Sequence, residues 1–174
     1  MDSRDEMGLD DIETPQQSRN ALAGDTPRSR VDYYRSVCQL PAVLDPATGR
    51  IGFTAGMVWA VAIPSEVGQM VKADLDARKQ GGGPIVTHPH SHTWTFLVRS
   101  DIPATMIAAE SAWLRTCRIA ILGNGDRVAL PSPTDQGSDY RGWITAAHSV
   151  FRPSGRAVLH SVHSFLTPAR RRAL

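Results

Sequence analysis

The spacing of apolar and polar residues along the chain predicts two or three helices separated by short strands. Apolar residues recur at helical spacing over residues 65–79, with charged residues opposite them, which predicts an amphipathic helix there. The apolar run 57–63 just before it predicts a strand buried on both faces. Asp32 can cap a first helix and Ser154 a last one, whose inward residues would be Val158, Leu159, Val162 and Phe165.

Turn-forming residues divide the remaining chain into strands. An Asp-Pro-Ala-Thr-Gly segment predicts a hairpin between strands at 42–44 and 50–54. An Asn-Gly pair suits a type I′ turn and predicts a second hairpin, between residues 118–122 and 127–130. Further strands are expected at 84–87, 93–99 and 141–144. These elements predict a single α+β domain with a mixed, mostly antiparallel sheet.

Composition narrows the class of protein. The chain has 174 residues, 41% of them apolar, which suffices for one ordinary domain. No run approaches the roughly 20 apolar residues of a membrane helix. No apolar segment follows a basic start, so a secretory signal is not expected either. Cys38 and Cys117 cannot build a disulfide framework and fit core thiols. We therefore expect a soluble, cytoplasmic protein with no membrane partner.

The net charge of +2 hides a strong asymmetry. Residues 1–30 carry seven acids and four arginines but few large apolar residues, so we expect a disordered acidic segment there. Residues 31–151 carry ten acids and ten bases, whereas residues 152–174 carry five arginines and no acid. The predicted organisation is the acidic segment over 1–30, one domain over 31–166 and a basic C-terminal tail over 167–174.

A histidine-rich segment is the first candidate site. In an extended segment alternate side chains point to the same side, so His88, His90 and His92 could converge on a metal ion. His160 and His163 share one face of the predicted last helix and could add ligands. Against this, no acid lies within eight residues of the segment, and histidines are common in solvated loops. We expect a surface role and no cofactor, with a divalent metal as the alternative.

The sequence offers little support for three other kinds of catalytic or metal site. The chain has neither a Gly-x-Ser-x-Gly nucleophile elbow nor a Gly-x-x-x-x-Gly-Lys phosphate loop. Asp74 and Asp76 would diverge on a helix and so would not chelate one ion. Asp74 instead suits a surface ion pair with Arg78, four residues along.

Arginines beside aromatic residues are the second candidate site, because they suit contacts with nucleic-acid phosphates and bases. Arg115 and Arg118 lie close to Trp113, and Arg141 lies between Tyr140 and Trp143. Tryptophans at strand positions are also typical of a core, so a structural role stays open. The candidate nucleic-acid-binding residues are Arg99, Arg115, Arg118, Arg141, Arg170, Arg171 and Arg172.

Four short segments between residues 50 and 145 follow one another in an order that is compared below with a known family. The predicted strand and helix over 57–79 come first, followed by Thr87-x-Pro89 and then Thr93-Trp94-Thr95-Phe96-Leu97-Val98. A Gly-rich turn then runs into Ala129-Leu130-Pro131-Ser132-Pro133, and Tyr140-Arg141-Gly142-Trp143 follows. In this order they resemble the N-terminal catalytic domain of bifunctional DNA primase/polymerases, of the archaeo-eukaryotic primase superfamily. The chain is also similar to a group of short actinobacterial proteins of this layout.

The resemblance implies a site that this sequence lacks. The family holds two divalent metals through acids at the end of the first core strand and a later acid, beside a catalytic histidine. Here residues 57–64 contain no acid, the histidine position falls at Thr93, and the later acid falls near Ile119. The resemblance therefore implies a degenerate primase/polymerase-like fold, with cleft candidates His90, His92, Thr93 and Trp94.

Three functional hypotheses follow. The first is a non-catalytic primase/polymerase-like domain that binds DNA, other nucleic acid or a nucleotide, accessory to a replication protein or a mobile element. The second is a metal-dependent hydrolase or nucleotidyl transferase built on His88, His90 and His92. The third is a scaffold or interaction protein that uses its acidic and basic ends. The missing acids favour a protein that is not an enzyme.

Overall fold

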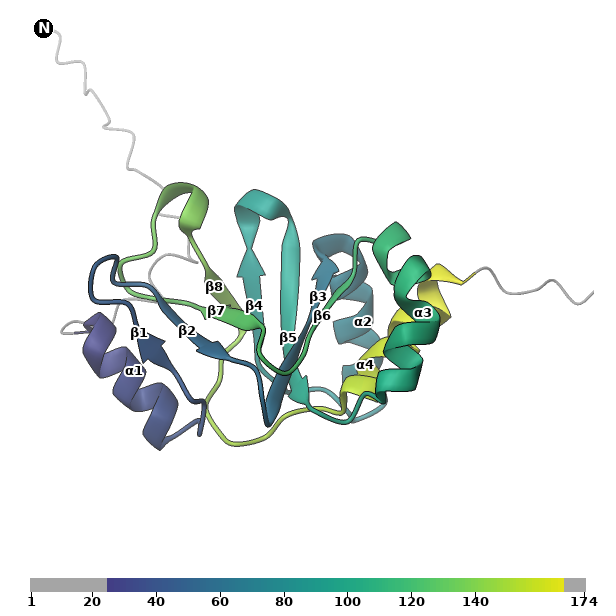
Figure 1. Ribbon diagram of the computed structural model, residues 1–174, viewed down its shortest axis with the longest axis horizontal. Coiled ribbons are helices and arrows are strands. Elements are labelled where there is room, and N and C mark those ends of the chain that lie inside the picture. Colours follow the sequence, from purple (N-terminus) through teal and green to yellow (C-terminus); the bar gives the residue numbers. More distant parts are fainter. Residues whose placement is uncertain (1–24, 168–174) are drawn as a thin grey trace, which may run out of the picture.

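Two antiparallel sheets and four helices make up the part of the chain that the computed structural model describes, residues 25–167 (Figure 1). This confirms the α+β class. The helices are α1 (Pro27–Ser36), α2 (Ser65–Ala77), α3 (Ala104–Thr116) and α4 (Gly155–Leu166), with short 3-10 turns η1 (Pro89–Ser91) and η2 (Gly137–Asp139). The strands are β1 (Val43–Leu44), β2 (Ile51–Thr54), β3 (Val58–Pro64), β4 (Ile85–His88), β5 (Thr93–Arg99), β6 (Ala120–Leu122), β7 (Arg127–Leu130) and β8 (Gly142–Thr145).

The larger sheet has the strand order β6-β3-β5-β4-β8, and each neighbouring pair is antiparallel. Helix α2 joins β3 to β4 with β5 lying between them, and α3 joins β5 to β6. This β-α-β-β-α-β arrangement is the ferredoxin-like motif. Ala62 of β3 pairs with Ala120 and Pro64 pairs with Thr93, so the end of β3 lies beside the beginnings of β5 and β6.

Helices α2, α3 and α4 cover one face of this sheet, on the right in Figure 1. Their buried residues, among them Val71, Leu114 and Leu159, form one apolar cluster with Ile63 and Phe96 of the sheet. The predicted cap of α4 is confirmed, because the Ser154 side chain accepts a hydrogen bond from the backbone N–H of Ala157. No helix among residues 25–167 is long and apolar enough to cross a membrane.

The smaller sheet, of strand order β1-β2-β7, packs with α1 against the other face of the larger sheet. Phe53 and Leu130 are fully buried there, in one cluster with Val86 and Leu97 of the larger sheet. The predicted hairpin between β1 and β2 is confirmed by the pairing of Val43 with Gly52. The larger sheet is therefore sandwiched between a helical layer and the smaller sheet.

The hairpin predicted between residues 118–122 and 127–130 is wrong. The turn forms, with the N–H of Asp126 donating to the carbonyl of Gly123 and with Gly125 at φ 91°. Its two strands then separate, because β6 pairs with β3 in the larger sheet and β7 pairs with β2 in the smaller one. The Asn-Gly signal identifies a tight turn but does not determine which strands its flanks will join.

Helix α1 begins earlier than predicted, at Pro27. Thr26 caps it, and the Thr26 and Ser29 side chains each bond the other residue's backbone N–H, at 3.2 and 2.9 Å. Asp32 therefore lies inside the helix rather than at its cap. The rest of the predicted acidic segment, residues 1–24, lies outside the described residues.

Helix α3 was not predicted, and its apolar face explains why. It buries only Leu114 completely, so its pattern is weak, whereas α2 buries Val71 and Leu75. Cys117, which directly precedes the strand predicted over 118–122, lies at the end of α3. Phe165 of α4 was predicted to point inward but is 42% exposed. Leu166, one residue later, packs with Leu159 and Val162 against the core instead.

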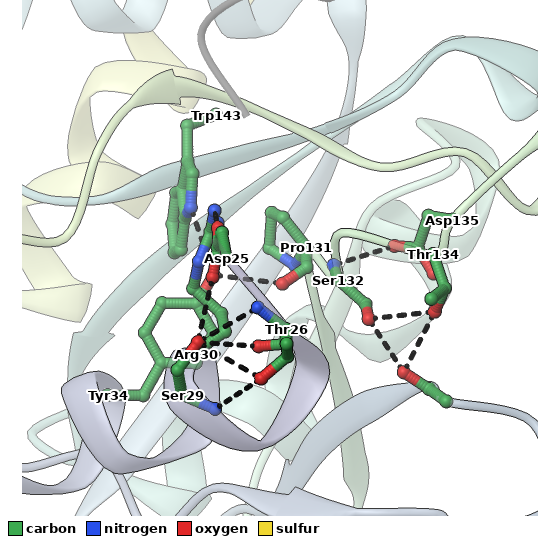
Figure 2. Close-up of polar contacts among 11 residues, drawn as sticks. Asp25, Thr26, Ser29, Arg30, Tyr34, Pro131, Ser132, Thr134, Asp135 and Trp143 are labelled. Carbon is green, nitrogen blue, oxygen red and sulfur yellow. Dashed lines mark hydrogen bonds and ion pairs between the residues drawn. The ribbon is translucent and has the colours of Figure 1, made fainter. Parts of the chain in front are cut away.

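Tyr34 joins α1 to two distant strands (Figure 2). Its ring is 1% exposed, and its hydroxyl donates to the carbonyl of Pro131 at 2.9 Å. The same oxygen accepts from Nε1 of Trp143 at 3.1 Å. Burial raises the pKa of Tyr34 to about 12, so the hydroxyl keeps its proton and serves as a hydrogen-bond centre.

Candidate nucleic-acid interface

The histidine-rich segment does not have the extended geometry that the metal hypothesis needs. β4 ends at His88, Pro89–Ser91 form the 3-10 turn η1, and His92 adopts a left-handed conformation at φ 49° and ψ 47°. The alternation of side chains therefore stops at His88. Within residues 25–167, no three His, Cys, Asp or Glu side chains come together in a way that could hold a metal ion.

His88 instead belongs to the sheet. Its Nε2 lies 3.2 Å from Oγ1 of Thr95 on the neighbouring strand, whereas His90 and His92 are exposed. Burial lowers the pKa of His88 to about 4, and the charge of Arg141 acts in the same direction. The ring is therefore neutral near pH 7.

The aromatic residues next to the candidate arginines make contacts within the protein. Trp143 packs edge-on against Tyr34, with the ring centres 5.9 Å apart. Trp113 stacks on His163 at 4.1 Å, with the rings nearly parallel at 7°. Each ring is therefore engaged on one side by a residue of the protein, which accounts for both tryptophans structurally. The feature of the candidate arginines that suits phosphate binding is their positive charge.

The ends of α3 and α4 meet at one side of the molecule, at the right of Figure 1. Besides stacking on Trp113, His163 lies with its Nε2 2.9 Å from Oε2 of Glu110. These contacts fix the last turn of α4 against α3. Sequence analysis missed the Glu110–His163 pair because α3 was not predicted and the two residues are far apart in the chain.

Arg115 and Arg118 are exposed at the end of α3. Arg115 lies in the last turn, and Arg118 follows the helix at φ 56°. Within residues 25–167 neither arginine forms an ion pair. Both guanidinium groups can therefore bind an external anion without first releasing a carboxylate.

The remaining candidate arginines are distributed around the molecule. Arg170, Arg171 and Arg172 lie outside the described residues, which end at Thr167, directly after α4. Arg99 lies far from Arg118: it pairs with Val58 at the start of β3, and its NH2 is 3.6 Å from a carboxylate oxygen of Asp101. Arg141 lies before β8, with its NH1 3.6 Å from the buried carboxylate of Asp135.

The cleft candidates lie around the end of β3. Thr93 pairs with Pro64, and Trp94 packs on α2, where a Cβ added to Gly68 would approach its ring to 3.1 Å. The backbone N–H of Ser65 donates to the carbonyl of His92 at 2.8 Å, which ties the His90–His92 loop to the start of α2. Ile119 is buried just before β6, the other neighbour of β3.

Three carboxylates of the domain, Asp101, Glu110 and Asp126, make hydrogen bonds within the fold. Asp101 accepts from the backbone N–H of Gly155 at 2.8 Å and so caps α4. Glu110 bonds His163, and Asp126 accepts from the backbone N–H of Gly123 at 2.9 Å within the turn. Each of the three therefore has a structural role away from Pro64 and Thr93.

Comparison of the chain with protein-family models, with curated proteins and with solved structures gives no match in any of the three.

Proposed function

We propose that this chain is a non-catalytic, primase/polymerase-like domain that binds nucleic acid through its phosphates. The observation that carries the proposal is the junction of α3 and α4. The Trp113–His163 stack places the end of α4, from which the arginine-rich tail continues, beside the helix that carries Arg115 and Arg118. Arg115 and Arg118 therefore lie at the end of the helix that packs against the last turn of α4, and the sequence continues from that turn to three further arginines. Arginines neutralise phosphates.

The binding mode follows from what the other surfaces do. In a four-stranded sheet that binds RNA, the face opposite the helices carries aromatic residues on which bases stack. Here the smaller sheet covers that face, with Phe53 and Leu130 buried against it. Base stacking on that face is thus excluded, and we infer contact with phosphates at the α3–α4 end instead, a mode without sequence preference.

Residues 57–64 contain no acid and Ile119 stands where the resemblance places the later one, which supports a role without phosphoryl transfer, since two-metal catalysis needs carboxylates to hold the cations. In this proposal the domain acts in the cytoplasm beside a replication protein or a protein of a mobile element. It contributes affinity for nucleic acid rather than chemistry.

Replacing Arg115 and Arg118 together with glutamine should weaken nucleic-acid binding by on the order of tenfold at low salt. The slope of log K against log salt should become shallower by about one unit for each arginine that contacts a phosphate. The measurement is fluorescence anisotropy with a labelled oligonucleotide, single-stranded and as its duplex, over a series of salt concentrations.

Arg99→Gln is the matched control, because Arg99 is also exposed but lies beside the start of β3 instead of the α3–α4 end. It should leave the affinity within about twofold of the wild type. Absence of binding at low salt would disprove the proposed function. An equal loss in Arg99→Gln would show that the charge of the chain matters and the α3–α4 end does not.

A further inference from the structure

A groove runs between α4, the N-terminal half of α3 and the C-terminal end of α2. Its volume is about 590 Å³, within the range of sites that hold a small organic ligand. Arg156, His160 and His163 of α4 line it at helical spacing, so one row of basic side chains follows its length. The groove is separate from the exposed arginines at the end of α3.

The polar lining of the groove consists mainly of hydrogen-bond donors. Within residues 25–167, the side chains of Arg156, His160 and Gln80 have no hydrogen-bond partner. Arg78 is held at the groove by its ion pair with Asp74, whose carboxylate also accepts from Oγ of Ser161 at 2.6 Å. The one carboxylate of the lining, Glu110, is bonded to His163. Within residues 25–167, a ligand therefore meets hydrogen-bond donors and the guanidinium of Arg156, which forms no ion pair, while the carboxylate of Asp74 interacts with His160.

The apolar lining of the groove comes from Met106 and Ala157, which are partly exposed, and from the buried Leu159. The stacked rings of Trp113 and His163 hold α3 to α4 at one end of it. The N–H groups at the start of α4 are already satisfied, by Asp101 and by Ser154. Anion binding here would therefore depend on side chains and would not depend on the helix N-terminus.

We propose that this groove binds the phosphomonoester of a small organic molecule. Arg156 and His160 would bind the phosphate, because a guanidinium group and an adjacent imidazole donor match its charge and its several acceptor oxygens. The body of the ligand would lie on Met106 and Ala157. The volume exceeds that of a phosphate ion several times over, which is why an ester with an apolar or planar body fits better than the free ion.

The probe is adenosine 5′-monophosphate, titrated into the full chain by calorimetry, with inorganic phosphate and adenosine as separate arms. The monophosphate should bind more tightly than either part alone. Arg156→Gln and His160→Gln should each weaken its binding about tenfold or more, which corresponds to the loss of one charge-assisted contact. Both side chains are exposed, so both variants should keep the wild-type melting temperature.

Two further variants test whether binding of the monophosphate depends on the groove itself. Arg28→Gln removes an exposed arginine from α1, outside the groove, and should leave binding of the monophosphate unchanged. The Arg115→Gln, Arg118→Gln double variant should also bind it normally, so this inference and the proposed nucleic-acid function can fail separately. The inference is overturned by no binding at millimolar probe, by equal binding in Arg156→Gln and His160→Gln, or by equal loss in Arg28→Gln.

Discussion

Replacing Tyr34 with alanine should lower the free energy of unfolding by about 4 kcal/mol, as expected for the loss of a fully buried aromatic side chain. Tyr34 is 1% exposed and belongs to the cluster shared by α1, the smaller sheet and the larger sheet. Its removal leaves a cavity and also removes the bonds to Pro131 and Trp143. Denaturant unfolding followed by tryptophan fluorescence and by circular dichroism would measure the change.

The conservative change Tyr34→Phe separates the two contributions. It keeps the ring but leaves the carbonyl of Pro131 and the N–H of Trp143 without their partner, which should cost about 1–3 kcal/mol. Tyr33→Phe is the matched control, because Tyr33 is 39% exposed and its hydroxyl bonds the carbonyl of Ala147 at 3.2 Å. A loss below 1 kcal/mol in Tyr34→Ala would contradict the role of Tyr34 as the link between α1 and the sheets.

The stability of the protein should fall between pH 6.5 and pH 4 because of His88. In the folded state burial lowers the pKa of His88 to about 4, while in the unfolded chain it keeps its ordinary value near 6.5. As the pH falls through this window the unfolded chain takes up a proton that the folded protein does not, so unfolding becomes easier. The loss is complete below about pH 4, where both states are protonated.

The expected loss from this single group is about 2–3 kcal/mol, since one pKa unit corresponds to 1.36 kcal/mol and the ring is not fully buried. His88→Gln keeps an amide that can bond Thr95 but removes the titration, so its stability should change less over the same window. His90→Gln, an exposed neighbour in the same loop, should keep the wild-type pH profile. Identical profiles for the wild type and His88→Gln would contradict the burial of a neutral ring.

Local sequence signals predicted the elements that rest on a strong pattern or a cap. The apolar spacing of α2 and the Ser154 cap of α4 are examples, and both are confirmed. Thr26 was missed as a cap because it lies in a segment whose composition indicates disorder, although its capping box with Ser29 is a local signal. α3 was missed because Leu114 is its one buried residue, while Met106, Ile107 and Trp113 pack on the core only partly buried, which leaves a weak amphipathic pattern.

The candidate sites were harder to predict because they depend on which segments meet. Asn124-Gly125 correctly indicated a turn, but the choice of β2 and β3 as partners for its flanks is a property of the whole fold. The metal hypothesis requires an extended segment, in which His88, His90 and His92 would point to the same side. The η1 turn after His88 ends the extended chain, so that condition is not met. The groove combines α2, α3 and α4, so it could not be assembled without α3.

The separation of β6 from β7 at the Gly123–Asp126 turn has a consequence for folding during synthesis. Helix α1 and strands β1 and β2 leave the ribosome first, but Ile51 needs Leu130 as its partner and Phe53 needs Val128. Closing so long a loop costs entropy, and pairing between distant segments is slow. This N-terminal part of the domain must therefore wait, with its apolar side chains exposed, until β7 has been made. In this interval the nascent protein is open to aggregation and to binding by chaperones.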